Sequence, residues 1–260
     1  MDQKDITLLS FFIDDGLIIG KPSGIAFIIN SLKSVGPNYG LFVSPKSKIG
    51  PLTKLYAGME SFQTLSKNFM FLGIPFGESK FIKEHLDNKI NTLENQLDLL
   101  LNNFQSNQVI FQFLSKSLSI CRLTFSLRNL DPFTNDFKEQ TIKFDKYIQR
   151  AIEALISSSL SKSQMSQASL PRSLCGLGIR TAEMTHRPAY TASLLASSEQ
   201  IKQLSPNFQI PQDVHSYVKT LKMDANTPIT QRNICQTLEK SQFKLLYDSS
   251  TLTSKAWLLP

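Results

Sequence analysis

The chain has 260 residues, of which 41% are hydrophobic and 19% charged, and its formal net charge is +7 at pH 7. This balance is ordinary for a globular protein of one or two domains, and the positive charge favours a polyanionic partner without identifying nucleic acid. No apolar run is long enough to cross a membrane. Three cysteines and three histidines without metal-ligand spacing argue against a disulfide framework and a zinc site.

The first predicted element is a β-hairpin over residues 8–20, LLSFFIDDGLIIG. Two apolar, β-prone runs flank Asp14, Asp15 and Gly16, and an Asp-Gly turn between such runs is a strong hairpin signal. The turn would place Asp14 and Asp15 at the tip, where two like charges repel unless a divalent cation such as Mg²⁺ binds both. The simpler interpretation is that acidic turn residues face solvent and bind nothing.

A helix over residues 25–35, with Ser23 as its cap, is predicted next. Its apolar residues recur at helical spacing, so one face should be buried. A short strand over residues 40–48 follows and ends in Lys46 and Lys48. The two lysines either neutralise an anionic group or mark a solvated strand end.

Residues 68–77, NFMFLGIPFG, predict a second tight hairpin or bend. Apolar flanks surround a glycine and a proline, which is typical of a turn between strands. Glycines at such a site also let the backbone approach another chain closely. Taken by itself, the segment is more simply explained as an ordinary glycine-rich turn.

From residue 78 the apolar period becomes helical, and three antiparallel helices with short loops predict a bundle. The second helix is expected over residues 108–127. Its predicted inward-facing residues are Ile110, Phe113, Leu114, Leu118, Cys121 and Phe125. The third begins near residue 135. Cations on these two helices either face a phosphate backbone or form a solvated surface. They are Lys116, Arg122, Arg128, Lys138, Lys143, Lys146 and Arg150.

The remaining chain predicts a connection followed by further helices. Residues 157–169 are rich in Ser and Gln and indicate a flexible connection. Residues 170–180, LPRSLCGLGIR, predict a bend that packs the next helix, 182–200, against the bundle. Helices are also expected over 213–222 and 229–246.

Several of these motifs resemble reverse transcriptases of the non-LTR retrotransposon type. Phe12-Ile13-Asp14-Asp15 is similar to their aromatic-x-Asp-Asp catalytic hairpin. Gly40-Leu41 and the lysines after it resemble the next element, with Ser44 where the family has Asn. Leu72-Gly73-Ile74-Pro75-Phe76-Gly77 resembles the primer grip. The helices that follow resemble the thumb, and residues 170–180 resemble a segment after it, with Cys175 in place of a glycine.

The resemblance implies an α+β fold with three regions: a partial palm at 1–77, a thumb-like bundle at 78–157, and a linker with a helical C-terminal region at 158–260. It implies catalytic roles for Asp14 and Asp15, with Mg²⁺ on both, and for one of Lys46 and Lys48, each of which lies one residue from the position of the family's lysine. The implied primer-grip residues are Leu72, Gly73, Pro75 and Gly77. The implied nucleic-acid-binding residues are Lys116, Arg122 and Arg128.

The implied activity is that of an RNA-directed DNA polymerase acting on an RNA template and a DNA primer in the nucleus or cytoplasm, without a membrane. Polymerases of this kind hold two metal ions with carboxylates from two separate strands. The second strand and the fingers would precede this segment, so we expect no polymerisation by the chain alone. The alternative is a non-catalytic basic helical module that binds nucleic acid or protein.

Overall fold

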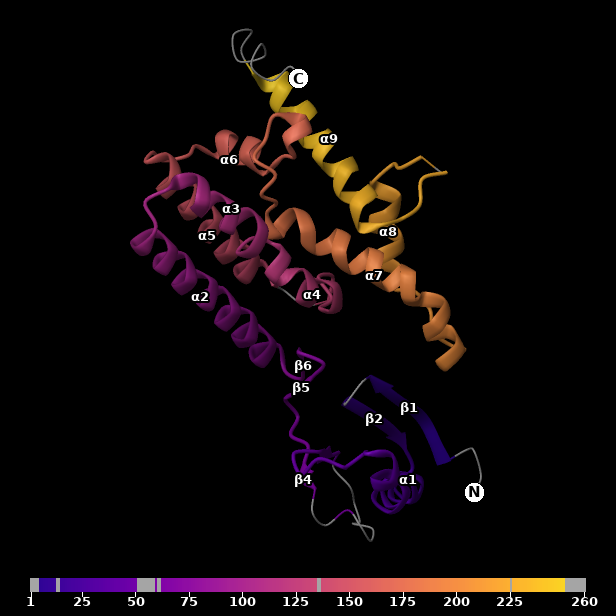
Figure 1. Cartoon of the computed structure of the whole chain (residues 1–260). Coiled ribbons are helices and arrows are strands. Elements are labelled where there is room, and N and C mark those ends of the chain that lie inside the picture. Colours follow the sequence, from indigo (N-terminus) through magenta and orange to yellow (C-terminus); the bar gives the residue numbers. More distant parts are fainter. Residues whose placement is uncertain are drawn as a thin grey trace. The chain divides into compact units, whose positions relative to one another are not determined.

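The computed structural model describes residues 5–12, 15–50, 59, 62–134, 137–224 and 226–250. Helices dominate, with three separate two-stranded sheets, so the fold class is α+β as the sequence predicts. The chain divides into two compact units, Met1–Ile82 and Lys83–Pro260. Figure 1 labels most strands and α1 of the first unit and the α-helices of the second.

The predicted first hairpin is confirmed, but its turn differs from the expected one. Strands β1 (Ile6–Phe12) and β2 (Asp15–Gly20) pair antiparallel, with Phe12 opposite Asp15. Asp15 and Gly16 therefore begin β2 instead of forming the turn. Gly16 lies opposite Phe11, and a Cβ atom on it would lie 2.5 Å from the Phe11 ring. Because Gly16 has no side chain, there is room for the Phe11 ring to lie across β2 at this position.

Helix α1 (Pro22–Val35) begins before the predicted start, and Ser23 is not its cap. Lys21 is the N-cap and makes no side-chain capping bond, while Pro22 occupies the first turn. A proline suits this position because its fixed φ matches a helix and its missing N–H needs no partner there. A short 3₁₀ helix, η2 (Gly36–Tyr39), follows and ends at Gly40, whose φ is +72°.

The strand predicted over residues 40–48 is wrong for most of its length. Residues 41–47 form no strand, because Ser44 folds them into a turn. Its hydroxyl accepts the Lys46 N–H at 3.2 Å and its carbonyl accepts the Ser47 N–H at 3.0 Å. Such local bonds compete with a strand ladder. Only β3 (Lys48–Ile49) is extended, and it pairs in parallel with β4 (Gln63–Thr64).

The second predicted hairpin is confirmed. Strands β5 (Phe69–Phe71) and β6 (Ile74–Phe76) pair antiparallel around a two-residue turn. The turn residues Leu72 and Gly73 both have positive φ, at 48° and 75°. This is the backbone that favours tight hairpins, because its twist matches that of the strands.

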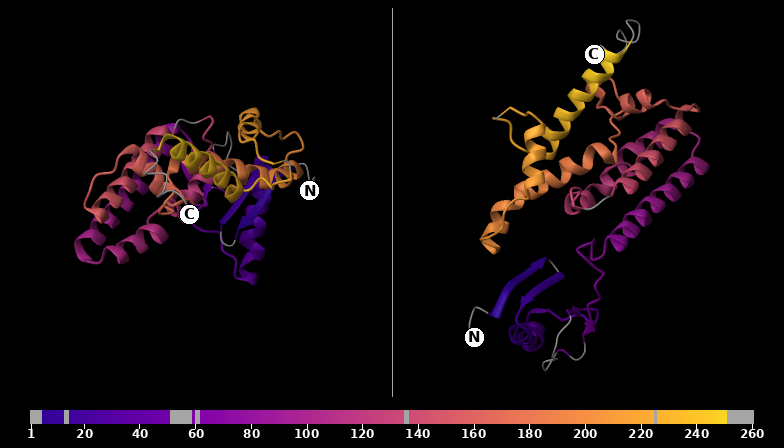
Figure 2. Two further views of the ribbon diagram at one scale, coloured as in Figure 1. Left: turned by 90° about the horizontal axis from the view of Figure 1, so that it is seen from above. Right: turned by 180° about the vertical axis from the view of Figure 1, so that it is seen from behind.

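In the second unit, helices α2 (Ser79–Asn103), α3 (Asn107–Ser117) and α5 (Lys138–Ile156) lie side by side, as two views show (Figures 1 and 2). Their apolar stripes meet in one core. Its most deeply buried side chains include Ile90, Leu97, Leu114, Phe144, Ile148 and Ile152. The predicted helical bundle is therefore present in this unit.

The single helix predicted over 108–127 is wrong, because α3 ends at Ser117 and α4 (Cys121–Asn129) begins in a new direction. The Tyr147 hydroxyl donates to the Leu118 carbonyl at 2.9 Å at this break. Because of this break, α4 buries a different face from the one that a continuous helix would bury, and Leu123, Ser126 and Leu127 point inward. Three residues predicted to be inside, Phe113, Cys121 and Phe125, are exposed instead.

The segment predicted as a flexible connection contains a helix, α6 (Lys162–Ser169). Ser161 and Gln164 form a capping box, which offsets the cost of starting so short a helix. A 3₁₀ turn, η3 (Arg172–Leu174), leads into α7 (Ala182–Leu204). Helix α7 packs on α4, α5 and α9. The predicted return of this helix onto the bundle is confirmed, as are α8 (Gln212–Thr220) and α9 (Gln231–Ser249).

Asp145 on α5 caps the N-terminus of α7. Its carboxylate accepts the Ala182 N–H at 2.6 Å and the Glu183 N–H at 3.2 Å, while Thr181 caps the Met184 N–H. Burial raises the pKa of Asp145 to about 6, although the two backbone hydrogen bonds lower it. The carboxylate thus anchors α7 to the bundle at a site where its charge is poorly solvated.

We expect Asp145 to make the stability of the protein depend on pH. The folded state holds the Asp145 proton more tightly than the unfolded state, so the protonated side chain stabilises the fold. This stabilisation is fully present below pH 3.8 and is lost as pH rises through about 6. The difference in pKa corresponds to about 3 kcal/mol. Urea denaturation of wild type and Asp145→Asn across this range measures it. The wild-type advantage should shrink as pH rises, and a constant difference would contradict the assignment.

Candidate functional site

Of the two predicted metal-binding aspartates, the structure describes one. Asp15 is exposed at the start of β2, and Asp14 lies outside the described residues. Within the described ranges, no three His, Cys, Asp or Glu side chains converge where they could hold a metal ion. The described residues therefore do not by themselves make a complete Mg²⁺ site. They supply at most part of one, and no catalytic step follows from them.

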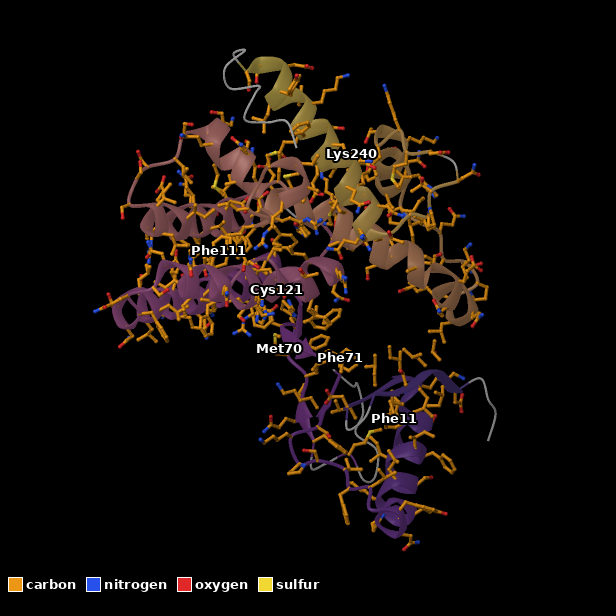
Figure 3. The ribbon with its side chains drawn as sticks, turned by 45° about the horizontal axis from the view of Figure 1, so that its top comes forward. Phe11, Met70, Phe71, Phe111, Cys121 and Lys240 are labelled. Atoms are coloured by element: carbon orange, nitrogen blue, oxygen red, sulfur yellow. The ribbon has the colours of Figure 1, made fainter. Side chains whose placement is uncertain are left out.

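The first hairpin exposes apolar side chains on both of its faces. Leu9 and Phe11 both lie on one face, and their side chains are 47% and 54% exposed. Ile19 lies on the opposite face and is 46% exposed. Figure 3 labels Phe11 on this hairpin. A two-stranded ribbon is marginally stable by itself, and exposed side chains of this size mark surfaces that other elements cover.

The two lysines predicted to be catalytic lie at an exposed bend of the first unit. Lys46 is in the turn made by Ser44, and Lys48 begins β3. Neither side chain forms an ion pair with Asp15 in the described part of the chain. The structure therefore does not bring the predicted catalytic lysines together with the predicted catalytic carboxylate.

The second hairpin carries the four residues predicted as a primer grip, and each has a local structural reason. Leu72 and Gly73 form the turn, and Pro75 is buried in β6 opposite Met70. Gly77 has φ +139°, and a Cβ atom there would overlap the Asn68 side-chain oxygen and lie 2.7 Å from the Lys67 carbonyl oxygen. Figure 3 labels Met70 and Phe71 on β5. The glycines are thus explained by the fold of the hairpin as well as by an approaching strand.

The three cations predicted to bind nucleic acid all lie at the surface of the second unit. Lys116 is exposed at the end of α3. Arg122 on α4 donates to the Gln96 side chain on α2 at 3.5 Å. Arg128 donates through two nitrogens to the Gln231 side chain, at 3.0 and 2.8 Å, and so links α4 to the start of α9. Arg128 has a structural contact that the sequence does not indicate.

Two further cations of the predicted positive face hold the bundle together. Lys143 contacts Asp87 at 3.6 Å and the Asn91 side chain at 2.7 Å, and Arg150 pairs with Asp98. Both pairs join α5 to α2. Since their charges are neutralised in place, these cations contribute less to a phosphate-binding surface than the sequence suggests.

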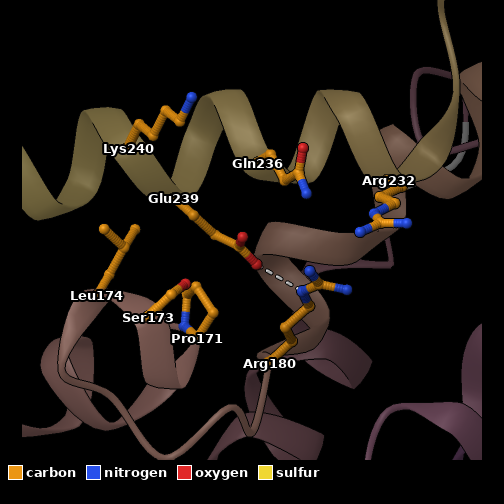
Figure 4. Close-up of a pocket in the computed structure, with 8 residues that line it drawn as sticks. All are labelled: Pro171, Ser173, Leu174, Arg180, Arg232, Gln236, Glu239 and Lys240. Atoms are coloured by element: carbon orange, nitrogen blue, oxygen red, sulfur yellow. Dashed lines mark hydrogen bonds and ion pairs between the residues drawn. The ribbon is translucent and has the colours of Figure 1, made fainter.

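The structure also forms a pocket of about 600 Å³ within the second unit that the sequence does not predict. Figure 4 shows α9 on one side and the segment after α6 on the other. The lining residues are Pro171, Ser173, Leu174, Arg180, Arg232, Gln236, Glu239 and Lys240. These residues lie up to about 70 positions apart in the sequence, so no short sequence motif indicates the pocket. The only indication in the sequence is a segment, residues 170–180, without an assigned role.

A buried ion pair forms one wall of this pocket. The Glu239 side chain is 3% exposed, and its carboxylate accepts from the Arg180 Nε at 2.5 Å. Burial lowers the pKa of Arg180, but the hydrogen bond and the charge of Glu239 outweigh burial and raise that pKa above its ordinary value. Arg180 is therefore charged and fixed at the pocket wall.

Comparison with known proteins gives no relative. No protein-family model matches the chain, and no curated protein or solved structure matches it either. In the described part of the chain, every helix is too short or too polar to span a membrane.

Proposed function

We propose that this chain is part of the reverse transcriptase domain of a transposable element, an RNA-directed DNA polymerase. The observation that carries the proposal is the order of elements: a hairpin whose second strand begins at Asp15, a helix, a second tight hairpin, and a helical bundle. In the intact enzyme, Asp14 and Asp15 would bind Mg²⁺ with a carboxylate from another strand. The bundle would hold the RNA template and the DNA primer.

The exposed apolar side chains of the first hairpin support this proposal. A palm domain would extend β1 and β2 with further strands and would pack other elements on the two faces that carry Leu9, Phe11 and Ile19. The chain would then supply only some of the carboxylates that bind the catalytic metal ions, because no third carboxylate lies with Asp15 among the described residues. We therefore expect no primer extension by the purified 260-residue chain in Mg²⁺.

The alternative function is a non-catalytic basic module that binds nucleic acid. The same lack of a third carboxylate in the described ranges favours it, as do exposed cations such as Lys116 and Lys146. Binding of an RNA–DNA hybrid that weakens steeply with salt would fit both functions, because both rest on phosphate contacts. Only the polymerase needs a metal ion at the hairpin.

Metal binding at the hairpin tests the proposal on the chain itself. Mn²⁺ replaces Mg²⁺ at oxygen sites and broadens nearby NMR signals. We expect Mn²⁺ to broaden the amide signals of Asp15 and Gly16 first, and the double substitution Asp14→Asn with Asp15→Asn to remove the effect. Asp213→Asn, an exposed carboxylate on α8, is the matched control. No preferential broadening, or an equal loss in the control, would overturn the proposal and leave the non-catalytic module.

A further inference from the structure

The pocket between α9 and the segment after α6 has the composition of an anion site. Arg232, Gln236 and Lys240 recur every four residues, so they lie on one side of α9, and all three line the pocket together with Arg180. In Figure 4 the Gln236 and Arg232 side chains lie toward Arg180, whereas the Lys240 nitrogen points away from it. The lining has three cations and one carboxylate, a net charge of +2. Its volume of about 600 Å³ suits a small molecule.

The cations retain donors for a ligand. Arg180 uses its Nε on Glu239, so its two terminal nitrogens remain for another acceptor. Arg232 and Lys240 are exposed and form no ion pair with a described residue. Because the one carboxylate in the lining is buried against Arg180, it does not neutralise the other two cations. An oxyanion would give Arg232 and Lys240 the negative partner that they lack among the described residues.

We propose that this pocket binds a diphosphate group, either as free pyrophosphate or as part of a small nucleotide. Guanidinium groups recognise phosphate oxygens in pairs, and an ammonium group adds a point charge. Arg232 and Lys240 are eight residues apart, or about 12 Å along the helix. A diphosphate is shorter than this rise, so the two long side chains must reach toward each other to share it, and two linked phosphates span more of the distance than one. The inference stands apart from the proposed polymerase function, because it uses residues of the second unit alone.

Calorimetric titration of the full chain with pyrophosphate, inorganic phosphate and ADP, in a phosphate-free buffer, tests the proposal. We expect pyrophosphate to bind at least about tenfold more tightly than phosphate. The double substitution Arg232→Ala with Lys240→Ala should weaken binding about tenfold or more, and it leaves the pair of Arg180 and Glu239 intact. Lys244→Ala, an exposed cation of α9 outside the lining, should change affinity less than about twofold.

The outcomes separate the two sources of the diphosphate. Tighter binding of ADP than of pyrophosphate would identify a nucleotide site, and the reverse would identify free diphosphate. Absent binding, an unchanged affinity in the double variant, or an equal loss in Lys244→Ala would overturn the proposal. Far-UV circular dichroism of each variant confirms that it is folded. None of these results bears on metal binding at the hairpin, so the two proposals fail independently.

Discussion

Replacing Arg180 with alanine should lower the free energy of unfolding by about 3 kcal/mol. The substitution leaves the Glu239 carboxylate buried, 3% exposed, without the one hydrogen-bond donor that the described structure gives it. Removing one partner of a buried pair is costly because the remaining charge stays out of water. We expect the lower end of the usual range, since the Arg180 side chain is itself 36% exposed.

Urea denaturation followed by circular dichroism measures this loss. Arg172→Ala is the matched control, because Arg172 is exposed in the same segment and has no ion pair in the described structure; its effect should stay within about 0.5 kcal/mol. The double variant Arg180→Met with Glu239→Leu should recover most of the stability, because it removes the buried charge together with its partner. Equal losses for Arg180→Ala and Arg172→Ala would show that the pair does not stabilise the fold.

The sequence predicts elements well where their signal is local. Apolar runs on either side of turn residues predict both hairpins, and the helical period predicts α2 and α5; α7, α8 and α9 also form where helices are expected. It fails where side chains redirect the backbone. The Ser44 turn replaces a strand, the Ser161 capping box produces a helix in a segment that looks like a linker, and the break before Cys121 turns the buried face of α4.

The candidate sites also differ in whether their residues are close together in the sequence. Asp14 and Asp15 are adjacent in sequence, so a short motif indicates them. The partners of Arg128, Lys143 and Arg150 lie on other helices, and their contacts depend on how those helices pack. The pocket joins Arg180 to α9, which begins 51 residues later. A single sequence carries no pattern for such a site, because packing alone brings the residues together.

Replacing Gly176 with alanine should lower the free energy of unfolding by about 3 kcal/mol. Residues 170–178 fold back over the end of α6: the Gly176 N–H donates to the Pro171 carbonyl at 3.1 Å, and the Gly178 N–H donates to the Leu170 carbonyl at 2.8 Å. A Cβ atom on Gly176 would overlap the Leu170 carbonyl oxygen and lie 2.6 Å from the Gln167 carbonyl oxygen. These are backbone atoms, so the segment must move to admit the methyl group.

Gly178→Ala is the control that separates crowding from backbone conformation. Gly178 has φ +76° and open space around its Cα, so alanine there should cost only about 1 kcal/mol of left-handed strain. Because Ser173 and Leu174 of this segment line the pocket, Gly176→Ala should also weaken pyrophosphate binding, whereas Gly178→Ala should leave it nearly unchanged. Urea denaturation and calorimetry measure the two effects. Equal costs for both glycines would mean that the close packing over α6 does not hold the segment in place.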